Sequence, residues 1–183
     1  EKESKTLEAI VKKEPLIYRG RISADDLLGE PDLLRLDEDG YVAGDIKSGA
    51  GEEGVEDDRR PKKHYAVQLA LYTDILERKG LSRKREPFVW DIHGDEVTYE
   101  LDELTGKRNP TTLWNIYQGT LDEARRNISN PENSSPAYSS ICKLCHWRKE
   151  CMKTLKRSDD LTLLPGLGRS MRQELIDRMP TVD

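Results

Sequence analysis

The spacing of apolar residues along the chain predicts alternating helices and strands. Apolar side chains recur every three to four positions in residues 1–13, 62–79 and 113–128, which is the pattern of an amphipathic helix. Strand-like segments lie between these helices, at 16–23, 31–37, 41–47, 87–93 and 96–101. The order is helix, three strands, helix, two strands, helix. We therefore expect an α/β fold with a mixed central sheet flanked by helices.

Turn-forming residues mark where these elements end. The segments Asp37-Glu38-Asp39-Gly40 and Gly94-Asp95 each separate two predicted strands and indicate hairpins. Gly80 follows the second predicted helix and is expected to cap it. Residues 48–61 are rich in glycine and charge and almost free of apolar side chains, which predicts a mobile surface loop. Residues 130–140 have the composition of a linker.

Composition narrows the class of protein. The chain has 183 residues, of which 35% are hydrophobic and 36% charged, with a formal net charge of -5. These values favour a modest core beneath a heavily charged surface. No apolar stretch has the length of a membrane span and no signal peptide opens the chain, so we expect a cytoplasmic protein that does not contact membranes. The start at Glu1 rather than Met suggests a piece of a longer protein.

Asp32, Asp45 and Lys47 are the strongest candidates for chemistry. Asp32 opens one predicted strand, and Asp45 and Lys47 end its hairpin partner two residues apart, on one face. Carboxylates that converge from paired strands provide oxygen ligands for Mg²⁺ or Mn²⁺, and the Ile46 carbonyl between the two side chains is a natural further ligand. Such an ion stabilises charge on a phosphate, and a neighbouring lysine orients the attacking water. Because this spacing is common, capping of a strand end remains an alternative.

Gln68 and Tyr72 strengthen this interpretation because they lie one turn apart on one face of the next predicted helix. Three successive segments then resemble the motifs of RecB-like nucleases of the PD-(D/E)XK superfamily: Gly29-Glu30-Pro31-Asp32-Leu33-Leu34, Gly44-Asp45-Ile46-Lys47-Ser48-Gly49 and Gln68-Leu69-Ala70-Leu71-Tyr72. The resemblance implies a restriction-endonuclease-like core in which Asp32 and Asp45 bind the metal and Lys47 is the catalytic lysine. It further implies that Gln68 and Tyr72 contact the DNA backbone or support the site; a purely interior role for both is the alternative.

The function implied by this resemblance is hydrolysis of DNA phosphodiester bonds by a divalent-metal-dependent deoxyribonuclease. Repair, recombination or defence would be its setting, with a helicase or nuclease complex as a partner. Enzymes of this type usually have an upstream helix whose His or Glu completes the metal site. The first predicted helix has Glu3 and Glu8 but no His. A catalytically incomplete DNA-binding module that keeps the nuclease fold is therefore the alternative.

The three cysteines, Cys142, Cys145 and Cys151, lie close together in the sequence. A clustered, odd set in a non-secreted chain favours metal ligation over disulfides. The spacing resembles part of the iron–sulfur staple in RecB-like nucleases of the AddB and CRISPR-adaptation type, which implies a 4Fe–4S cluster in the intact protein with a fourth cysteine upstream. Because His146 follows Cys145 directly, c-type haem attachment and a zinc site stay open, as do three free thiols.

The C-terminal segment 161–176 has the sequence Leu-Pro-Gly-Leu-Gly between two short helical patterns. This resembles a helix-hairpin-helix, whose glycine-rich turn offers backbone N–H groups to a DNA phosphate. Arg169 and Arg172 would add phosphate contacts, although an ordinary tight turn is the alternative. We expect a nuclease core at 1–139, a cysteine cluster at 140–157 and a small helical appendage with this tail at 158–183.

Overall fold

The computed structural model describes residues 1–55, 59–106 and 109–178. The α-helices are α1 (Lys2–Val11), α2 (Lys63–Arg78), α3 (Leu113–Ser129), α4 (Arg148–Arg157) and α5 (Arg169–Arg178). The longer strands are β1 (Leu16–Tyr18), β2 (Ile22–Ala24), β3 (Leu27–Gly29), β4 (Leu33–Asp37), β5 (Gly40–Ile46), β8 (Phe88–Trp90) and β9 (Glu96–Thr98). Two-residue strands are β6 (Glu52–Glu53), β7 (Arg60–Pro61), β10 (Leu104–Thr105) and β11 (Thr111–Thr112). Short 3-10 helices are η2 (Pro131–Asn133), η3 (Ser140–Leu144) and η4 (Leu161–Leu163).

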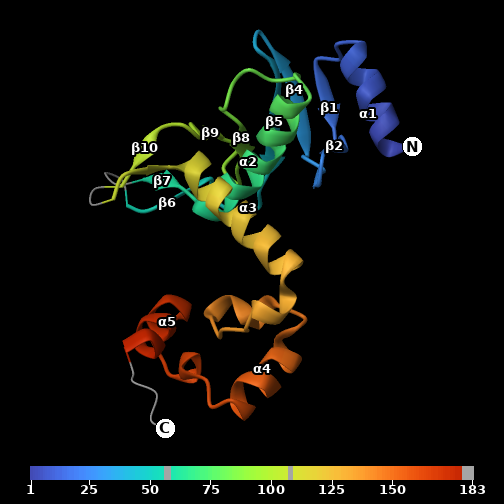
Figure 1. Cartoon of the computed structure of the whole chain (residues 1–183). Coiled ribbons are helices and arrows are strands. Elements are labelled where there is room, and N and C mark those ends of the chain that lie inside the picture. The colour runs from blue at the N-terminus through green and yellow to red at the C-terminus, as the bar shows by residue number, and fades with distance from the viewer. Residues whose placement is uncertain (56–58, 107–108, 179–183) are drawn as a thin grey trace. The chain divides into compact units, whose positions relative to one another are not determined.

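The chain divides into two compact units, residues 1–124 and 125–183. The first unit contains a five-stranded sheet in the order β1-β4-β5-β8-β9 (Figure 1). Strand β5 pairs parallel with β8, whereas the other neighbours pair antiparallel. The parallel pair requires a crossover, and α2 provides it. This mixed sheet with flanking helices confirms the predicted α/β fold class.

One face of the sheet carries the main core. Leu34, Tyr41 and Ala43 pack against α1 and against Tyr72, Ile75 and Leu76 of α2. A neighbouring cluster joins α2 to β8 and to the start of α3. Helix α2 contacts β5 of this sheet and also β2 and β3, and α1 contacts β2.

Two predicted segments differ from the observed elements. The predicted strand at 16–23 is interrupted after Tyr18, where Arg19 adopts a positive φ of 50°, and β2 and β3 then form a separate hairpin around Asp25 at φ 53°. A left-handed turn at a non-glycine residue leaves little signal in the sequence. The segment 48–61, predicted as a loop, contains the β6–β7 pair; residues 56–58 lie outside the described part.

Helix α2 ends as its sequence predicts. Gly80 has a φ of 67°, and its N–H donates to the Glu77 carbonyl at 2.9 Å. The next N–H, that of Leu81, donates to the Leu76 carbonyl at 2.9 Å, which completes a Schellman motif. The predicted glycine cap is confirmed.

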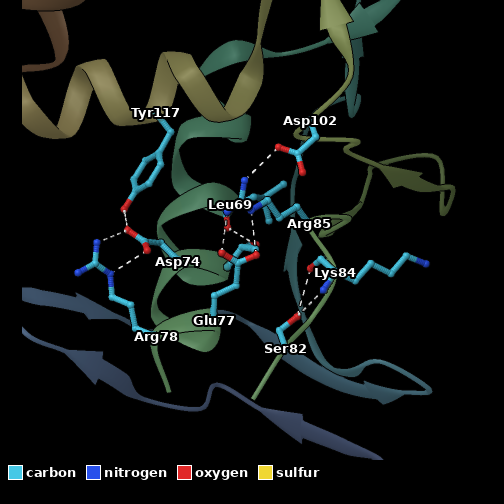
Figure 2. Close-up of polar contacts among 10 residues, drawn as sticks. Leu69, Asp74, Glu77, Arg78, Ser82, Lys84, Arg85, Asp102 and Tyr117 are labelled. Carbon is cyan, nitrogen blue, oxygen red and sulfur yellow. Dashed lines mark hydrogen bonds and ion pairs between the residues drawn. The ribbon is translucent and has the colours of Figure 1, made fainter. Parts of the chain in front are cut away.

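A polar network fixes α2 against α3. Asp74 is buried, and its carboxylate accepts hydrogen bonds from the Tyr117 hydroxyl at 2.7 Å and from Arg78 at 2.8 and 3.1 Å (Figure 2). Arg78 also pairs with Asp25 in the β2–β3 hairpin at 2.7 Å. These contacts join three parts of the first unit around the helix that carries Gln68 and Tyr72.

The second unit is small and mostly helical. Leu155 of α4 and Thr162 of η4 are its most buried side chains, and the hydroxyl of Thr162 accepts a hydrogen bond from the Tyr138 N–H at 2.8 Å. None of the described helices is long and apolar enough to cross a bilayer. The domain limits expected at residues 139 and 157 remain predictions.

Candidate active site

The register of the β4–β5 hairpin places two carboxylates side by side. Leu33 of β4 pairs with Gly44 of β5, so Asp32 and Asp45 lie opposite one another one step further along. The Ile46 N–H donates a hydrogen bond to Asp32 Oδ2 at 3.0 Å, which holds this carboxylate against β5. Asp45 is buried, with 4% of its surface exposed. The predicted convergence of the two aspartates is therefore what the fold produces.

Lys47 connects this pair to α2. Its ammonium forms an ion pair with Asp45 and donates a hydrogen bond to Gln68 Oε1 at 2.7 Å. The amide of Gln68 in turn donates to the Tyr72 hydroxyl at 2.8 Å. Gln68 and Tyr72 are one helical turn apart, so both side chains leave the same face of α2. Four of the predicted site residues thus form one continuous hydrogen-bonded chain.

Burial governs the ionisation of this cluster. It raises the pKa of Asp45 above its ordinary value, against the hydrogen bond and charge of Lys47, and the neighbouring carboxylate of Asp32 adds to the increase. Burial likewise raises the pKa of Tyr72, so its phenol stays protonated at neutral pH. A cation bound near Asp32 and Asp45 would offset the repulsion between their charges.

Two glycines make room for aromatic rings around the site. A Cβ atom at Gly29 would lie 2.6 Å from Cδ1 of Tyr72, so only glycine admits this ring. The ring of Phe88 covers Gly44, where a Cβ atom would clash with Cζ of that ring. The reason is the in-register pairing of Gly44 with Phe88 across the parallel strands.

Tyr65 and Lys62 belong to the same neighbourhood, and the sequence interpretation did not assign them to the site. The Lys47 ammonium lies 5.0 Å from the centroid of the Tyr65 ring, and the Lys62 ammonium lies 5.3 Å from it. Tyr65 precedes Gln68 by three residues, and this helical spacing was the available signal. The two lysines give this side of the carboxylate pair a positive charge.

A comparison with protein families now identifies the chain. The model of the PD-(D/E)XK nuclease superfamily matches residues 2–152. The chain belongs to the PD-(D/E)XK nuclease superfamily. No curated protein matches it significantly. Membership of this superfamily supports a nuclease activity in general, and the match extends beyond the sheet into the cysteine segment.

The side chains at this site provide some, but not all, of the ligands that a hard cation needs. Asp32 and Asp45 offer carboxylate oxygens, the ligands that Mg²⁺ and Mn²⁺ prefer. Neither acidic residue of α1 joins them: Glu3 accepts hydrogen bonds from the N–H and hydroxyl of Ser23, and Glu8 pairs with Lys12. Across the described ranges, no three His, Cys, Asp or Glu side chains converge as a metal-binding group. The fit therefore rests on two carboxylates.

The cysteines do not meet in one place. Cys142 lies in η3, where the Ser139 N–H donates to its sulfur at 3.4 Å. Hydrogen bonds from the N–H and hydroxyl of Ser139 lower the pKa of this thiol. Cys145 is exposed beyond the end of η3, and Cys151 is half-buried in α4. Among the described residues the three thiols do not form a ligand group in this arrangement.

The C-terminal turn exists, but one predicted phosphate contact is wrong. Residues 164–168 join η4 to α5, with Gly166 at a φ of 83°. Arg172 is only 7% exposed, and its guanidinium donates to Asp160 and to the Pro136 carbonyl, both at 2.8 Å. A buried arginine whose donors are engaged inside the unit is a structural residue and does not reach a DNA phosphate.

Proposed function

We propose that the chain is a divalent-metal-dependent nuclease that hydrolyses DNA phosphodiester bonds. Asp32, Asp45 and the Ile46 carbonyl would hold Mg²⁺ or Mn²⁺. The observation that supports this most strongly is the hydrogen-bonded chain from Asp45 through Lys47 and Gln68 to Tyr72, within a superfamily of nucleases. RecB-like motifs in the same order favour a nuclease of that type.

Each protein group has a definite task in this proposal. When bound, the divalent ion supplies positive charge that stabilises the phosphate as negative charge develops on it. The Lys47 ammonium donates a hydrogen bond to the phosphate or to the attacking water, and its position is set by Asp45 and Gln68. Tyr72 orients Gln68 through its hydroxyl. The buried setting of Asp45 strengthens all these electrostatic contacts because little water screens them.

A catalytically incomplete DNA-binding module is the second candidate. The observation that favours it is the donor set, since α1 directs Glu3 to Ser23 rather than to the carboxylate pair. A site with two protein carboxylates binds a hard cation weakly unless waters or substrate phosphates complete its shell. In this case DNA binding would persist without cleavage.

Cleavage assays separate the two candidates. Labelled single- and double-stranded DNA is incubated with the protein and Mg²⁺ or Mn²⁺, and with EDTA as the metal-free reference. We expect metal-dependent cleavage that Asp45→Asn and Lys47→Ala abolish. Asp95→Asn is the matched control, because Asp95 lies exposed in the β8–β9 hairpin. Binding without cleavage by the folded wild-type protein would favour the DNA-binding module.

We further propose that Cys142, Cys145 and Cys151 ligate a 4Fe–4S cluster in the intact protein. The C-x2-C-x5-C spacing supports this, and the three thiols would have to move together and be joined by a fourth ligand. Anaerobic purification followed by visible spectroscopy tests it. Broad absorbance of a brown protein that is lost in Cys145→Ser is the expected result, whereas a colourless protein without bound iron would contradict it.

The setting of this activity is proposed on the family resemblance alone. It consists of repair, recombination or defence with a helicase or nuclease-complex partner. A cytoplasmic location is proposed separately, from the clustered cysteines of the sequence. The 164–168 turn would add a helix-hairpin-helix contact to DNA phosphates, with Arg172 excluded from that role by its burial.

A further inference from the structure

Charge is distributed unevenly between the two compact units. Residues 125–183 contain 11 Lys and Arg against 7 Asp and Glu, a net charge of +4. Residues 1–124 contain 19 against 28, a net charge of -9. A polyanion is therefore attracted to the second unit much more strongly than to the first.

The positive charge is concentrated on α4. Lys149, Lys153 and Lys156 are exposed and recur at intervals of four and three, so they form one stripe along the helix. The stripe spans about 10 Å along the helix axis at the usual rise per residue. Leu155 is buried against the rest of the second unit, which turns the lysine stripe outward.

Few carboxylates lie close enough to neutralise the charge of these lysines. Lys153 pairs with Glu150 at 2.8 Å, and both side chains are largely exposed, so the pair is weak. In the part of the chain that the structure describes, no carboxylate lies within ion-pair distance of Lys149 or Lys156. An open hollow of about 730 Å³ follows the stripe, and its lining includes the three lysines with Arg148 and Met152.

An aromatic side chain stands at the start of this stripe. Trp147 is the residue before α4, and 64% of its surface is exposed. The ring of His146 lies beside it, with 5.4 Å between the ring centroids. An indole of this kind offers a face on which an unpaired base can stack, whereas the bases of a duplex are already stacked and paired.

We propose that Trp147 and the lysine stripe of α4 form a binding site for single-stranded DNA. The lysines contact successive phosphates, and Trp147 stacks with a base at one end of the stripe. The identity of the ligand as DNA rests on the proposed nuclease function, but the site itself belongs to the second unit and needs neither Asp45 nor a metal ion.

The test measures DNA binding under conditions in which the protein does not cleave DNA. Full-length protein carrying Asp45→Asn is titrated, in EDTA, into a labelled oligo-thymidine at several salt concentrations. Removing two phosphate contacts with Lys149→Gln and Lys156→Gln should weaken binding and reduce the slope of log K against log salt by about 1.4. The matched control is Lys5→Gln with Lys12→Gln, which changes one exposed lysine of α1 and the exposed lysine that directly follows the helix, and it should leave the slope unchanged.

The aromatic contribution is tested separately. Trp147→Ala should weaken binding about tenfold, and Trp147→Phe should retain most of it, because stacking requires a flat ring. Equal affinity of the Ala variant and its parent would overturn the stacking role. Equal affinity for heparin, for duplex DNA and for the oligo-thymidine would overturn single-strand recognition. Since no step requires hydrolysis, a failed cleavage assay and a failed binding assay remain distinguishable.

Discussion

Lys47 lies at the centre of the candidate site because its ammonium contacts groups on two different elements. Asp45 of β5 lies on one side and Gln68 of α2 on the other. The Tyr65 ring adds a third neighbour at 5.0 Å. These contacts hold the Lys47 ammonium in one position. The side chain would therefore not have to move before its charge interacts with a reacting phosphate.

The first prediction concerns the support of Lys47. Gln68→Met removes the oxygen that accepts its hydrogen bond and should lower the single-turnover cleavage rate at least tenfold, since hydrogen bonds to charged groups contribute about 1.5–3 kcal/mol. Tyr72→Phe removes only the acceptor of the Gln68 amide and should lower the rate about fivefold. A larger effect for Tyr72→Phe than for Gln68→Met would contradict this order of support.

The second prediction concerns the glycine beneath Tyr72. Gly29→Ala places a methyl group 2.6 Å from the Tyr72 ring, so the ring must shift and the hydrogen bond to Gln68 is lost. We expect slower cleavage and a lower melting temperature. Gly119→Ala in α3 is the control, because nothing lies within 4 Å of its Cβ position. This control should stabilise the helix by about 0.5–1 kcal/mol, and similar losses in both variants would refute the steric argument.

At the scale of elements, α2 has two functions. Its Gln68 and Tyr72 complete the candidate site, and its Asp74, Arg78 and Glu77 hold the surrounding segments (Figure 2). Glu77 accepts hydrogen bonds from Arg85 at 2.8 and 3.1 Å, and Arg85 also reaches Asp102. The helix is therefore fastened near its C-terminal end, while Gln68 in its N-terminal half accepts the hydrogen bond from Lys47.

The third prediction tests this fastening. Tyr117→Phe removes the hydroxyl that donates to buried Asp74, and it should reduce the free energy of unfolding by about 1–3 kcal/mol. Chemical denaturation followed by circular dichroism measures the change. Tyr18→Phe is the matched control, because Tyr18 is 68% exposed and its loss of a hydroxyl should be neutral. Equal stability of the two variants would show that the Asp74 network does not hold α3.

Much of the fold and the candidate site could be predicted because both depend on short-range periodicity. The alternation on β4 and β5 placed Asp32 opposite Asp45, and the helical repeat placed Gln68 beside Tyr72. The β2–β3 hairpin was missed because it turns at Asp25, a non-glycine residue with a positive φ. Strands of two residues, as in β6 and β7, are shorter than any detectable period.

The internal partners of Glu3 and Arg172 could not be predicted from the sequence. The sequence does not show that Glu3 turns toward Ser23, or that Arg172 is buried beside Asp160. Both side chains were plausible partners of a metal or a phosphate until packing gave them internal partners. Such assignments depend on tertiary structure, which no single segment encodes.

At the scale of the whole molecule, the two units carry opposite net charges. The hydrophobic clusters found among the described residues belong to the first unit. The second unit depends on the Arg172–Asp160 pair, which also engages Thr162 and Ser135. Because this unit has few buried apolar side chains among its described residues, we expect the buried ion pair to be important for its stability.

The fourth prediction concerns this pair. Arg172→Ala leaves Asp160 without its cation and should destabilise the second unit by about 3 kcal/mol, whereas Arg178→Ala on the exposed end of α5 should have little effect. Limited proteolysis that reports cleavage within residues 125–183 measures the difference. Equal resistance of both variants would contradict a structural role for Arg172.

The same pair predicts a dependence on pH. Burial alone would raise the pKa of Asp160, but hydrogen bonds from Thr162 and Arg172 lower it below its ordinary value. Its stabilising contribution is therefore fully present above about pH 4, the pKa in the unfolded chain, and is lost as the pH falls through the lower folded value. Asp160→Asn should be less stable than wild type at pH 7, with the difference shrinking toward pH 2. A difference that stays constant would exclude this linkage.

The most direct test of the proposed nuclease centre is the single-turnover rate of DNA cleavage as a function of Mn²⁺ concentration, measured for the wild-type protein and for Asp32→Asn. We predict a rate that rises with Mn²⁺ and saturates in the wild type, and no measurable cleavage by the folded variant at any Mn²⁺ concentration. Equal rates for the two proteins, or cleavage that persists in EDTA, would contradict a metal centre at Asp32 and Asp45.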